Sequence, residues 1–367
     1  VLFALSIAFA LTTIFTGCEK EDPIVPESNS ILPDKFSVDI PGGLSMDPAT
    51  KKSTETIDTL NGNVIYMHLR TFIHSGEAGA EIVESIIRHI VVFNINEPMS
   101  LSYESDEDGR TKNLDVIENS YFDGVNWEYQ LTITDALSEG DEDGGIGLQI
   151  FWNRSPRKGI AILKPFNIDR DENTDSPDAV FRIDYSEAGE RGYDAHMLVA
   201  ASGLEMSHPL VNPFSMSTLK MFVGKKDDII DIYGNSDHPN ATFFTSAVGF
   251  NWAFVAAGYE GREMGVAEVG LPPSNLDEPS RSVLLGDYSV KNVFSDQIYE
   301  LWPYIDSSDV EAYLYNTEAP GFFNQNGFLQ GGTSPGEEYD RIEARLPVLS
   351  PYNPKEISDM DIQFKLE

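Results

Sequence analysis

Short apolar runs, broken at regular intervals by turn residues, are the feature that most constrains the fold of this chain. From Leu101 onward, runs rich in Val, Ile, Phe, Trp and Thr alternate with clusters of Gly, Asn and Asp. Such spacing is typical of all-β domains, in which short turns join successive strands. We therefore expect strands at 127–134, 146–152, 159–163, 180–185, 196–200, 218–223, 242–248, 252–256 and 265–269.

Two Asp-Gly dipeptides predict how these strands are connected. Asp108-Gly109 and Asp123-Gly124 are typical of tight hairpin turns, because glycine adopts a positive φ without strain. The spacing further predicts that 146–152 pairs with 159–163, and that 180–185 pairs with 196–200. The expected arrangement is an antiparallel meander or a barrel-like sheet.

One long segment has helical periodicity instead. Apolar residues in 77–93 recur at three- and four-residue spacing, with Ser75 as a suitable N-cap and Pro98 as the far limit. The apolar stripe predicts that this helix packs on the sheet. Shorter helices are expected at 295–301 and 308–315. The predicted fold class is therefore α+β and β-rich, with one N-terminal helix packed on the sheet.

The chain begins with an apolar run that has no charge. Residues 1–15 are too few for an ordinary membrane-spanning helix, which needs roughly 20 residues. They suit the apolar region of a secretory signal. Small residues such as Gly17 stand directly before Cys18, the only cysteine of the chain. We expect residues 1–17 to be a signal peptide that lacks its initiator Met and basic n-region.

This segment resembles the lipobox of bacterial lipoproteins. The resemblance implies that Cys18 is lipidated on sulfur and becomes the new N-terminus after cleavage. Phe15 departs from the pattern, since Leu is more usual at its position. Because a single lipid chain gives only marginal membrane binding, stable anchoring implies two or more chains on this cysteine.

The residues after Cys18 suggest where the anchored protein lies. The acidic stretch 19–22 resembles the signal that follows the cysteine in lipoproteins exported to the surface of Bacteroidetes-type cells. It implies the outer membrane and the cell surface, with a periplasmic inner-leaflet position as the alternative. Residues 18–30 are polar and proline-bearing, so we expect a lipidated cysteine followed by a flexible tether.

The charge of the chain excludes one class of partner. It has 60 Asp and Glu residues against 25 Lys and Arg, a net charge of −35. Such a charge repels the phosphate backbone, and no long basic patch interrupts it. We therefore expect no nucleic-acid partner, and contact with the membrane through the lipid anchor.

A short repeat suggests two similar halves within the body at 31–367. Gly124-Val-Asn-Trp127 recurs as Gly249-Phe-Asn-Trp252, and each copy precedes a strand. Similar Gly-containing strands follow at 158–161 and 264–267. An internal duplication and a chance match both account for these short identities.

One acidic loop is a weak candidate for a calcium site. Oxygen side chains at alternate positions can face one hard cation, and calcium takes six to eight oxygens. The loop resembles the first half of an EF-hand-type calcium loop, but Thr174 replaces the glycine and Val180 replaces the bidentate glutamate. A solvated acidic loop is the alternative. The candidate ligands are Asp169, Asp171, Asn173 and Asp175.

Signatures of catalysis are weak. Gly332-Thr-Ser334-Pro-Gly336 matches the G-x-S-x-G pattern, but Pro335 has no N–H to donate to an oxyanion. The last histidine, His238, also precedes the serine, whereas the triad histidine should follow it. We read this segment as a loop, and the sequence favours a non-catalytic protein.

Four tryptophans offer rings that could stack on sugars. Trp127, Trp152 and Trp252 lie in predicted strands and are expected in the sheet core. Trp302 is directly followed by Pro303, so we expect it to be exposed and name it as the candidate ligand-binding residue.

These observations favour a non-catalytic, lipid-anchored binding or structural protein that captures glycans beside an outer-membrane transporter. One alternative is a surface glycoside hydrolase, which needs two carboxylates about 5–10 Å apart. The other is a calcium-stabilised adhesin that uses residues 169–175. Calcium is the only cofactor that the sequence suggests.

Overall fold

The computed structural model describes residues 30–33, 35–46, 62–204, 215–242 and 247–366. The expected signal peptide, Cys18 and nearly all of the tether lie outside these residues. The chain divides into two compact units. We call them the β1–β7 unit (described residues 30–33, 35–38, 77–204 and 361–366) and the β8–β13 unit (39–46, 62–76, 215–242 and 247–360).

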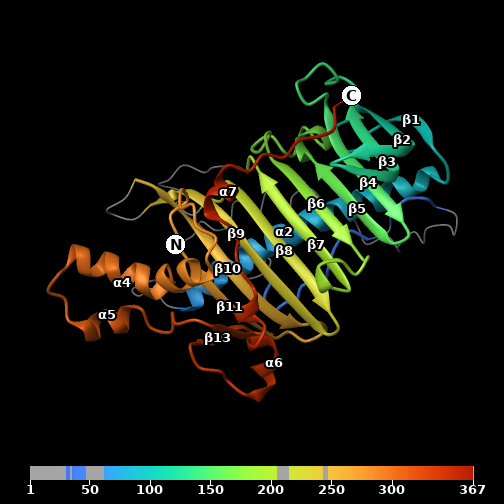
Figure 1. The fold of residues 1–367 in the computed structure, drawn as a ribbon. Coiled ribbons are helices and arrows are strands. Elements are labelled where there is room, and N and C mark those ends of the chain that lie inside the picture. The colour runs from blue at the N-terminus through green and yellow to red at the C-terminus, as the bar shows by residue number, and fades with distance from the viewer. Residues whose placement is uncertain (1–29, 34, 47–61, 205–214, 243–246, 367) are drawn as a thin grey trace. The chain divides into compact units, whose positions relative to one another are not determined.

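In the β1–β7 unit, each strand pairs antiparallel with the strand that follows it in the chain (Figure 1). The predicted pairs of 146–152 with 159–163 and of 180–185 with 196–200 are confirmed. The strands are β1 (Met99–Glu104), β2 (Thr111–Phe122), β3 (Val125–Asp135), β4 (Ile146–Arg154), β5 (Arg157–Leu163), β6 (Val180–Ser186) and β7 (Ala195–Ser202).

The β8–β13 unit repeats this plan with six described strands. Within the described residues of either unit, the last strand does not pair with the first, so neither set of strands closes into a ring. The predicted β-rich α+β class and antiparallel meander are confirmed. The strands are β8 (Thr218–Lys226), β9 (Ile229–Thr242), β10 (Gly249–Tyr259), β11 (Gly265–Gly270), β12 (Gly321–Asn324) and β13 (Gly327–Gly331).

Asp123-Gly124 forms the tight hairpin turn that the sequence predicted, whereas Asp108-Gly109 lies in a longer connection between β1 and β2. Asp123 and Gly124 have φ values of 52° and 77° between β2 and β3. Two successive positive φ values match the right-handed twist of a hairpin. Gly109, at φ 62°, lies in the turn between β1 and β2. These turns fix the register of the first two hairpins.

Most of the predicted strand at 242–248 lies outside the described residues, and a longer strand before it was not predicted. β9 ends at Thr242, β10 begins at Gly249, and residues 243–246 lie outside the described part. β9 was not predicted because Gly, Pro and several polar residues within it are typical of loops. These polar groups are nevertheless buried, and they find partners inside the fold: the Asn235 amide donates to Asn251 Oδ1 at 2.6 Å.

The main helix begins much earlier than predicted. Helix α2 spans Gly62–Ile90, and η3 (Val91–Phe93) follows it. Ser75 is therefore not an N-cap; its hydroxyl donates to the Thr71 carbonyl oxygen within the helix. Gly76 serves close packing instead, since an added Cβ would lie 2.6 Å from Met221 Cε. The missed first turns also bury apolar side chains, namely Tyr66, Leu69, Phe72 and Ile73.

The remaining helices are short. The predicted helices at 295–301 and 308–315 correspond to α4 (Val290–Leu301) and α5 (Ser307–Tyr313). The others are α3 (Pro165–Ile168), η4 (Glu190–Gly192), η5 (Ser282–Asp287), η6 (Glu337–Tyr339), α6 (Asp340–Glu343), η7 (Leu346–Val348) and α7 (Pro354–Ser358).

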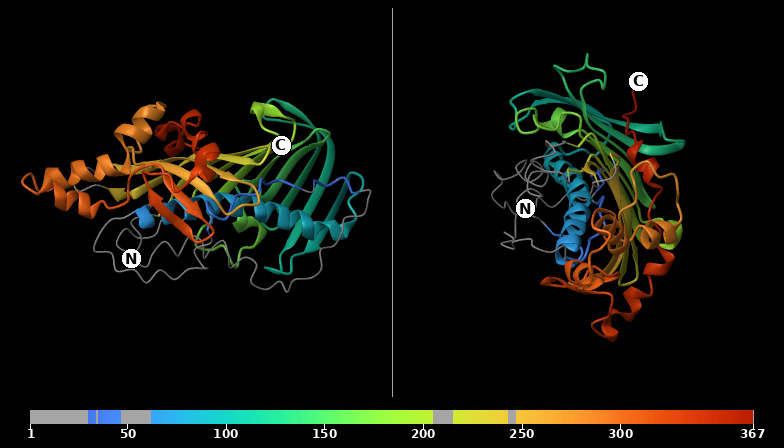
Figure 2. Two further views of the ribbon diagram at one scale, coloured as in Figure 1. Left: turned by 90° about the horizontal axis from the view of Figure 1, so that it is seen from below. Right: turned by 90° about the vertical axis from the view of Figure 1, so that its left-hand side faces the viewer.

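Strands of the β8–β13 unit are covered on both faces (Figure 2). On one face, Phe72 of α2 makes an edge contact with Trp252 of β10, with ring centroids 5.2 Å apart. On the other face, Ile342 and Leu346 pack with Val255 in one apolar cluster. Every residue of β10 is buried in consequence.

The β1–β7 unit covers its strands with distant parts of the chain. Gly79 of α2 lies against Phe181 of β6, so an added Cβ would be 3.1 Å from the ring. The C-terminal residues Ile362 and Phe364 pack against a separate cluster that contains Phe151. The helix that precedes the strands and the residues that follow the last helix therefore both help to bury this sheet.

The two copies of the short repeat lie at different places in their meanders. Trp127 is on β3, which is separated from β5 by β4. Trp252 is on β10, which pairs directly with β11. The later Gly-containing strands are thus not in equivalent positions. Among the described residues, no helix combines the length and the apolar character needed to cross a membrane.

We expect Gly321→Ala to destabilise the β8–β13 unit. An added Cβ would overlap the buried ring of Tyr66, which is stacked on Phe328 and cannot move aside. Overpacking of this kind costs about 1–3 kcal/mol, measurable by chemical denaturation. Gly286→Ala is the control, because nothing lies within 4 Å of its added Cβ. Equal stability of the two variants would contradict the packing argument.

Candidate functional site

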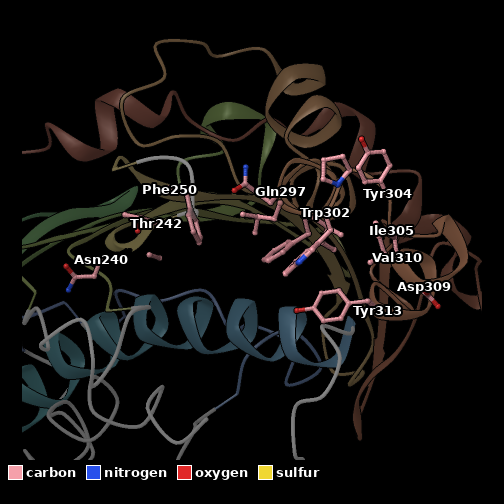
Figure 3. A pocket seen from close by; sticks show the side chains of 15 residues that line it. Asn240, Thr242, Phe250, Gln297, Trp302, Tyr304, Ile305, Asp309, Val310 and Tyr313 are labelled. Carbon is pink, nitrogen blue, oxygen red and sulfur yellow. The ribbon is translucent and has the colours of Figure 1, made fainter.

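A large cavity lies within the β8–β13 unit, between the ends of β9 and β10 and the helical hairpin α4–α5 (Figure 3). Its volume is about 1210 Å³. Ligand sites usually occupy roughly 300–1,000 Å³, so this one is large. Its apolar lining is Ala241, Phe250, Phe294, Ile298, Leu301, Trp302, Pro303, Ile305 and Val310.

Local sequence signals build the hairpin wall of this cavity. The Ser289 hydroxyl caps α4 by accepting from the Asn292 N–H, and the Asp306 carboxylate caps α5 by accepting from the Ser308 N–H at 2.8 Å. The hydrogen bonds from Ser308 hold the pKa of Asp306 below its usual range. Between the two helices, Pro303 prevents α4 from continuing past Trp302.

The hairpin has a small apolar core of its own. Ile298 from α4 packs with Val310 and Leu314 from α5, and Phe294 and Ile305 lie against them. Some of these side chains also line the cavity. The wall is therefore held in shape by packing between the two helices.

Trp302 is 57% exposed, as the sequence predicted, and lines the cavity. The other three tryptophans are buried as expected, with Trp127 at 5%, Trp152 at 1% and Trp252 at 2%. Trp302 directly follows the last residue of α4, at the start of the connection to α5. It is the one tryptophan that is placed to meet a ligand.

Further aromatic and polar groups share the cavity with Trp302. Figure 3 shows Phe250 on the sheet side, with Trp302 and Tyr313 on the side of the hairpin. Tyr304, which follows Pro303, is almost fully exposed. Side chains that can form hydrogen bonds are distributed among the apolar ones, namely Asn240, Thr242, Gln297, Tyr304, Asp309 and Tyr313.

The cavity does not have the charges that catalysis by paired carboxylates needs. Among its described lining residues, Asp309 is the only acidic one. Glycoside hydrolysis uses two carboxyl groups on either side of the bond. The arrangement suits binding by ring contacts and hydrogen bonds better than hydrolysis.

Sequence analysis identified Trp302 but missed its neighbours. Asn240, Thr242 and Phe250 belong to β9 and β10, so only the tertiary structure brings them to the hairpin. The hairpin residues had a usable signal. Five aromatic residues stand between positions 299 and 315, in a stretch that is otherwise rich in acidic and polar residues.

The candidate calcium ligands do not converge on one point. Asp169 is buried, and its Oδ1 accepts from the backbone N–H of Asp171 at 2.9 Å. The Asn173 amide donates to the Asp169 carbonyl oxygen, whereas Asp171 and Asp175 are exposed. In the described part of the chain, no group of three or more His, Cys, Asp or Glu side chains is arranged to hold a metal ion. The calcium hypothesis thus gains no support from this loop.

Cations of the protein itself neutralise the acidic groups beside this loop. Lys112, only 1% exposed, donates to Asp108 at 2.8 Å and to Asp135 at 3.0 Å. The Arg110 guanidinium also makes two hydrogen bonds to Asp135. Burial alone would raise the pKa of Asp135, but these bonds and charges hold it well below its usual range.

The candidate catalytic groups are not among the described residues that line the cavity. The Ser334 segment is a loop, as expected, and the Ser334 hydroxyl donates to the Gly336 carbonyl oxygen. Ser236 Oγ and His238 Nε2 are 2.8 Å apart, which is a suitable distance for a nucleophile and its base. Both residues are fully buried, however, so no substrate reaches this pair.

Comparisons of the chain with protein-family models, with curated proteins and with solved structures found no match.

We expect Lys112→Met to destabilise the β1–β7 unit by about 3–5 kcal/mol at pH 7, because it leaves two buried carboxylates short of a cation. A carboxylate with a depressed pKa stabilises the fold above the pKa of the unfolded chain, near 4, and loses that effect as the pH falls. The difference between wild type and variant should therefore shrink below pH 4 in denaturant titrations.

The matched control for this prediction is Arg88→Met. Arg88, whose side chain is 63% exposed, forms a solvent-accessible ion pair at 3.8 Å with the less exposed Glu84 of the same unit. Exposed pairs contribute at most about 1 kcal/mol. A Lys112→Met variant as stable as this control would show that the buried charges do not support the fold.

Proposed function

We propose that this protein is a lipid-anchored binding protein of the outer membrane, exposed at the cell surface, that captures a glycan in the cavity beside the α4–α5 hairpin. It passes the glycan to a neighbouring outer-membrane transporter and does not cleave it. The membrane contact is the lipid on Cys18.

The observation that supports this proposal is the position of Trp302. An exposed tryptophan at the edge of a large cavity offers a flat apolar face to a sugar ring. Tyr313 and Phe250 add ring surface, while Asn240 and Gln297 supply groups that hydrogen-bond to hydroxyls. Such a site binds by stacking and polar contacts at the same time.

Two features favour binding over hydrolysis. One acidic residue, Asp309, lies among the described lining residues, whereas hydrolysis uses two. The buried Ser236–His238 pair is out of reach of a substrate. A carboxylate such as that of Asp309 can instead accept a hydrogen bond from a sugar hydroxyl.

Trp302→Ala should weaken glycan binding by at least about tenfold, since truncating a central aromatic anchor typically costs 2 kcal/mol or more. The probes are soluble starch, xylan, mannan and a mixed-linkage β-glucan. They are screened by thermal shift on residues 19–367, and hits are measured by calorimetry. Trp302→Phe should retain most of the affinity because it keeps a ring.

Tyr315→Ala is the matched control, because Tyr315 is exposed near the same hairpin but is not among the cavity residues. It should bind like wild type. The absence of a shift with every polysaccharide, or equal binding by Trp302→Ala and wild type, would refute glycan capture at this site.

Cys18→Ser in the native precursor should move the protein from the membrane fraction to the soluble fraction, because the sulfur that receives the lipid is lost. Fractionation followed by immunoblotting measures this change. Phe15→Leu, which restores the more usual residue, should leave the protein anchored. Digestion by added protease in intact cells tests surface exposure. A Cys18→Ser protein that stays with the membrane would contradict lipidation.

A further inference from the structure

We infer that the cavity recognises an uncharged amphiphile, with an alkyl or acyl chain inside the cavity and a sugar at its edge. This inference rests on the proposed function and narrows its ligand from a glycan to a glycan joined to an apolar chain. The cavity lining, the charges around it and its size each bear on this choice.

The interior of the cavity is more apolar than a sugar requires. Ala241, Phe250, Phe294, Ile298 and Val310 come from both walls and present no polar side-chain atom. Sugar hydroxyls placed against these groups would lose their hydrogen bonds to water without replacement, which is unfavourable. A hydrocarbon chain gains free energy at the same surface.

The polar groups are suited to an uncharged head. Asn240, Thr242 and Gln297 both donate and accept hydrogen bonds, as sugar hydroxyls do. Because these groups line the same cavity as the apolar side chains, one molecule with two chemically different ends can satisfy both.

The charges of the residues that line the cavity disfavour a ligand with an anionic head. No Lys, Arg or His is found among the described residues that line the cavity, and Asp309 is acidic. The nearby cation Lys291 is already held by Glu318 at 2.7 Å and by Glu311 at 2.9 Å. A fatty acid carboxylate or an anionic phospholipid head would therefore meet no compensating charge.

The size of the cavity fits a two-part ligand. Its volume of about 1210 Å³ exceeds the usual range for small-molecule sites. It therefore has room for a sugar in addition to a chain. The hairpin core of Ile298, Val310 and Leu314 keeps this space open by packing the two helices against each other.

The test uses maltose and the octyl, decyl and dodecyl maltosides, each below its micellar concentration, with residues 19–367. Binding is followed by calorimetry and by tryptophan fluorescence, because Trp302 is the one exposed tryptophan of the four. We expect one maltoside per chain, with an affinity that rises about threefold to fourfold per added methylene. Dodecanoate, whose carboxylate meets no cation among the described lining residues, should bind at least tenfold more weakly than dodecyl maltoside.

A matched pair of variants locates the binding. Leu301→Asp places a charge on the cavity wall and should weaken dodecyl maltoside binding at least tenfold. Tyr299→Asp, on the same helix, should not. Leu301 is 38% exposed and Tyr299 is 39% exposed, but only Leu301 lines the cavity. Both variants should fold, since neither position is buried.

The outcomes separate this inference from the proposed function. Equal affinity for maltose and all maltosides, or no maltoside binding, would overturn the inference that the ligand is an amphiphile. Glycan capture would still be tested separately by the polysaccharide panel. Chain-length dependence that Leu301→Asp leaves unchanged would place binding elsewhere and also overturn the inference. Tighter binding of dodecanoate than of dodecyl maltoside would refute the uncharged head.

Discussion

The pairing of backbone N–H and C=O groups is the constraint on which this structure depends. A buried strand must satisfy these groups, since leaving them unpaired costs as much as a lost hydrogen bond. Within each unit, every strand meets the requirement by pairing with its neighbours in the sequence. Short turns such as Asp123-Gly124 then suffice to set the register.

The second requirement is that the faces of the strands are covered. Segments that are far away in the sequence provide this cover. In the β8–β13 unit, α2 and the elements around α6 enclose β10 from opposite sides. Complete enclosure explains why polar residues of β9 are buried and must find partners inside the fold, such as Asn251 for Asn235. It also explains the glycines at close contacts, such as Gly76 beside Met221, where a larger residue would separate the layers.

The cavity arises where this covering stops. The α4–α5 hairpin packs on its own small core, so it forms a wall without filling the space in front of the ends of β9 and β10. The result is a cavity lined mainly by apolar side chains, with hydrogen-bonding groups and an exposed indole among them. The acidic loop at 169–175 of the β1–β7 unit offers no comparable binding site. Lysine and arginine side chains already neutralise the carboxylates beside it.

The sequence by itself determined the local features: the strands β3 to β8, β10 and β11, the hairpin turns, the two short helices and the exposure of Trp302. Each follows from neighbouring residues, as when Pro303 prevents α4 from continuing past Trp302. Only the tertiary structure decided where α2 begins, that β9 is a strand, and that Phe250 and Asn240 meet Trp302. These outcomes depend on burial by distant segments, which reverses the local preference of Ser75-Gly76 for a helix start and of polar residues for a loop.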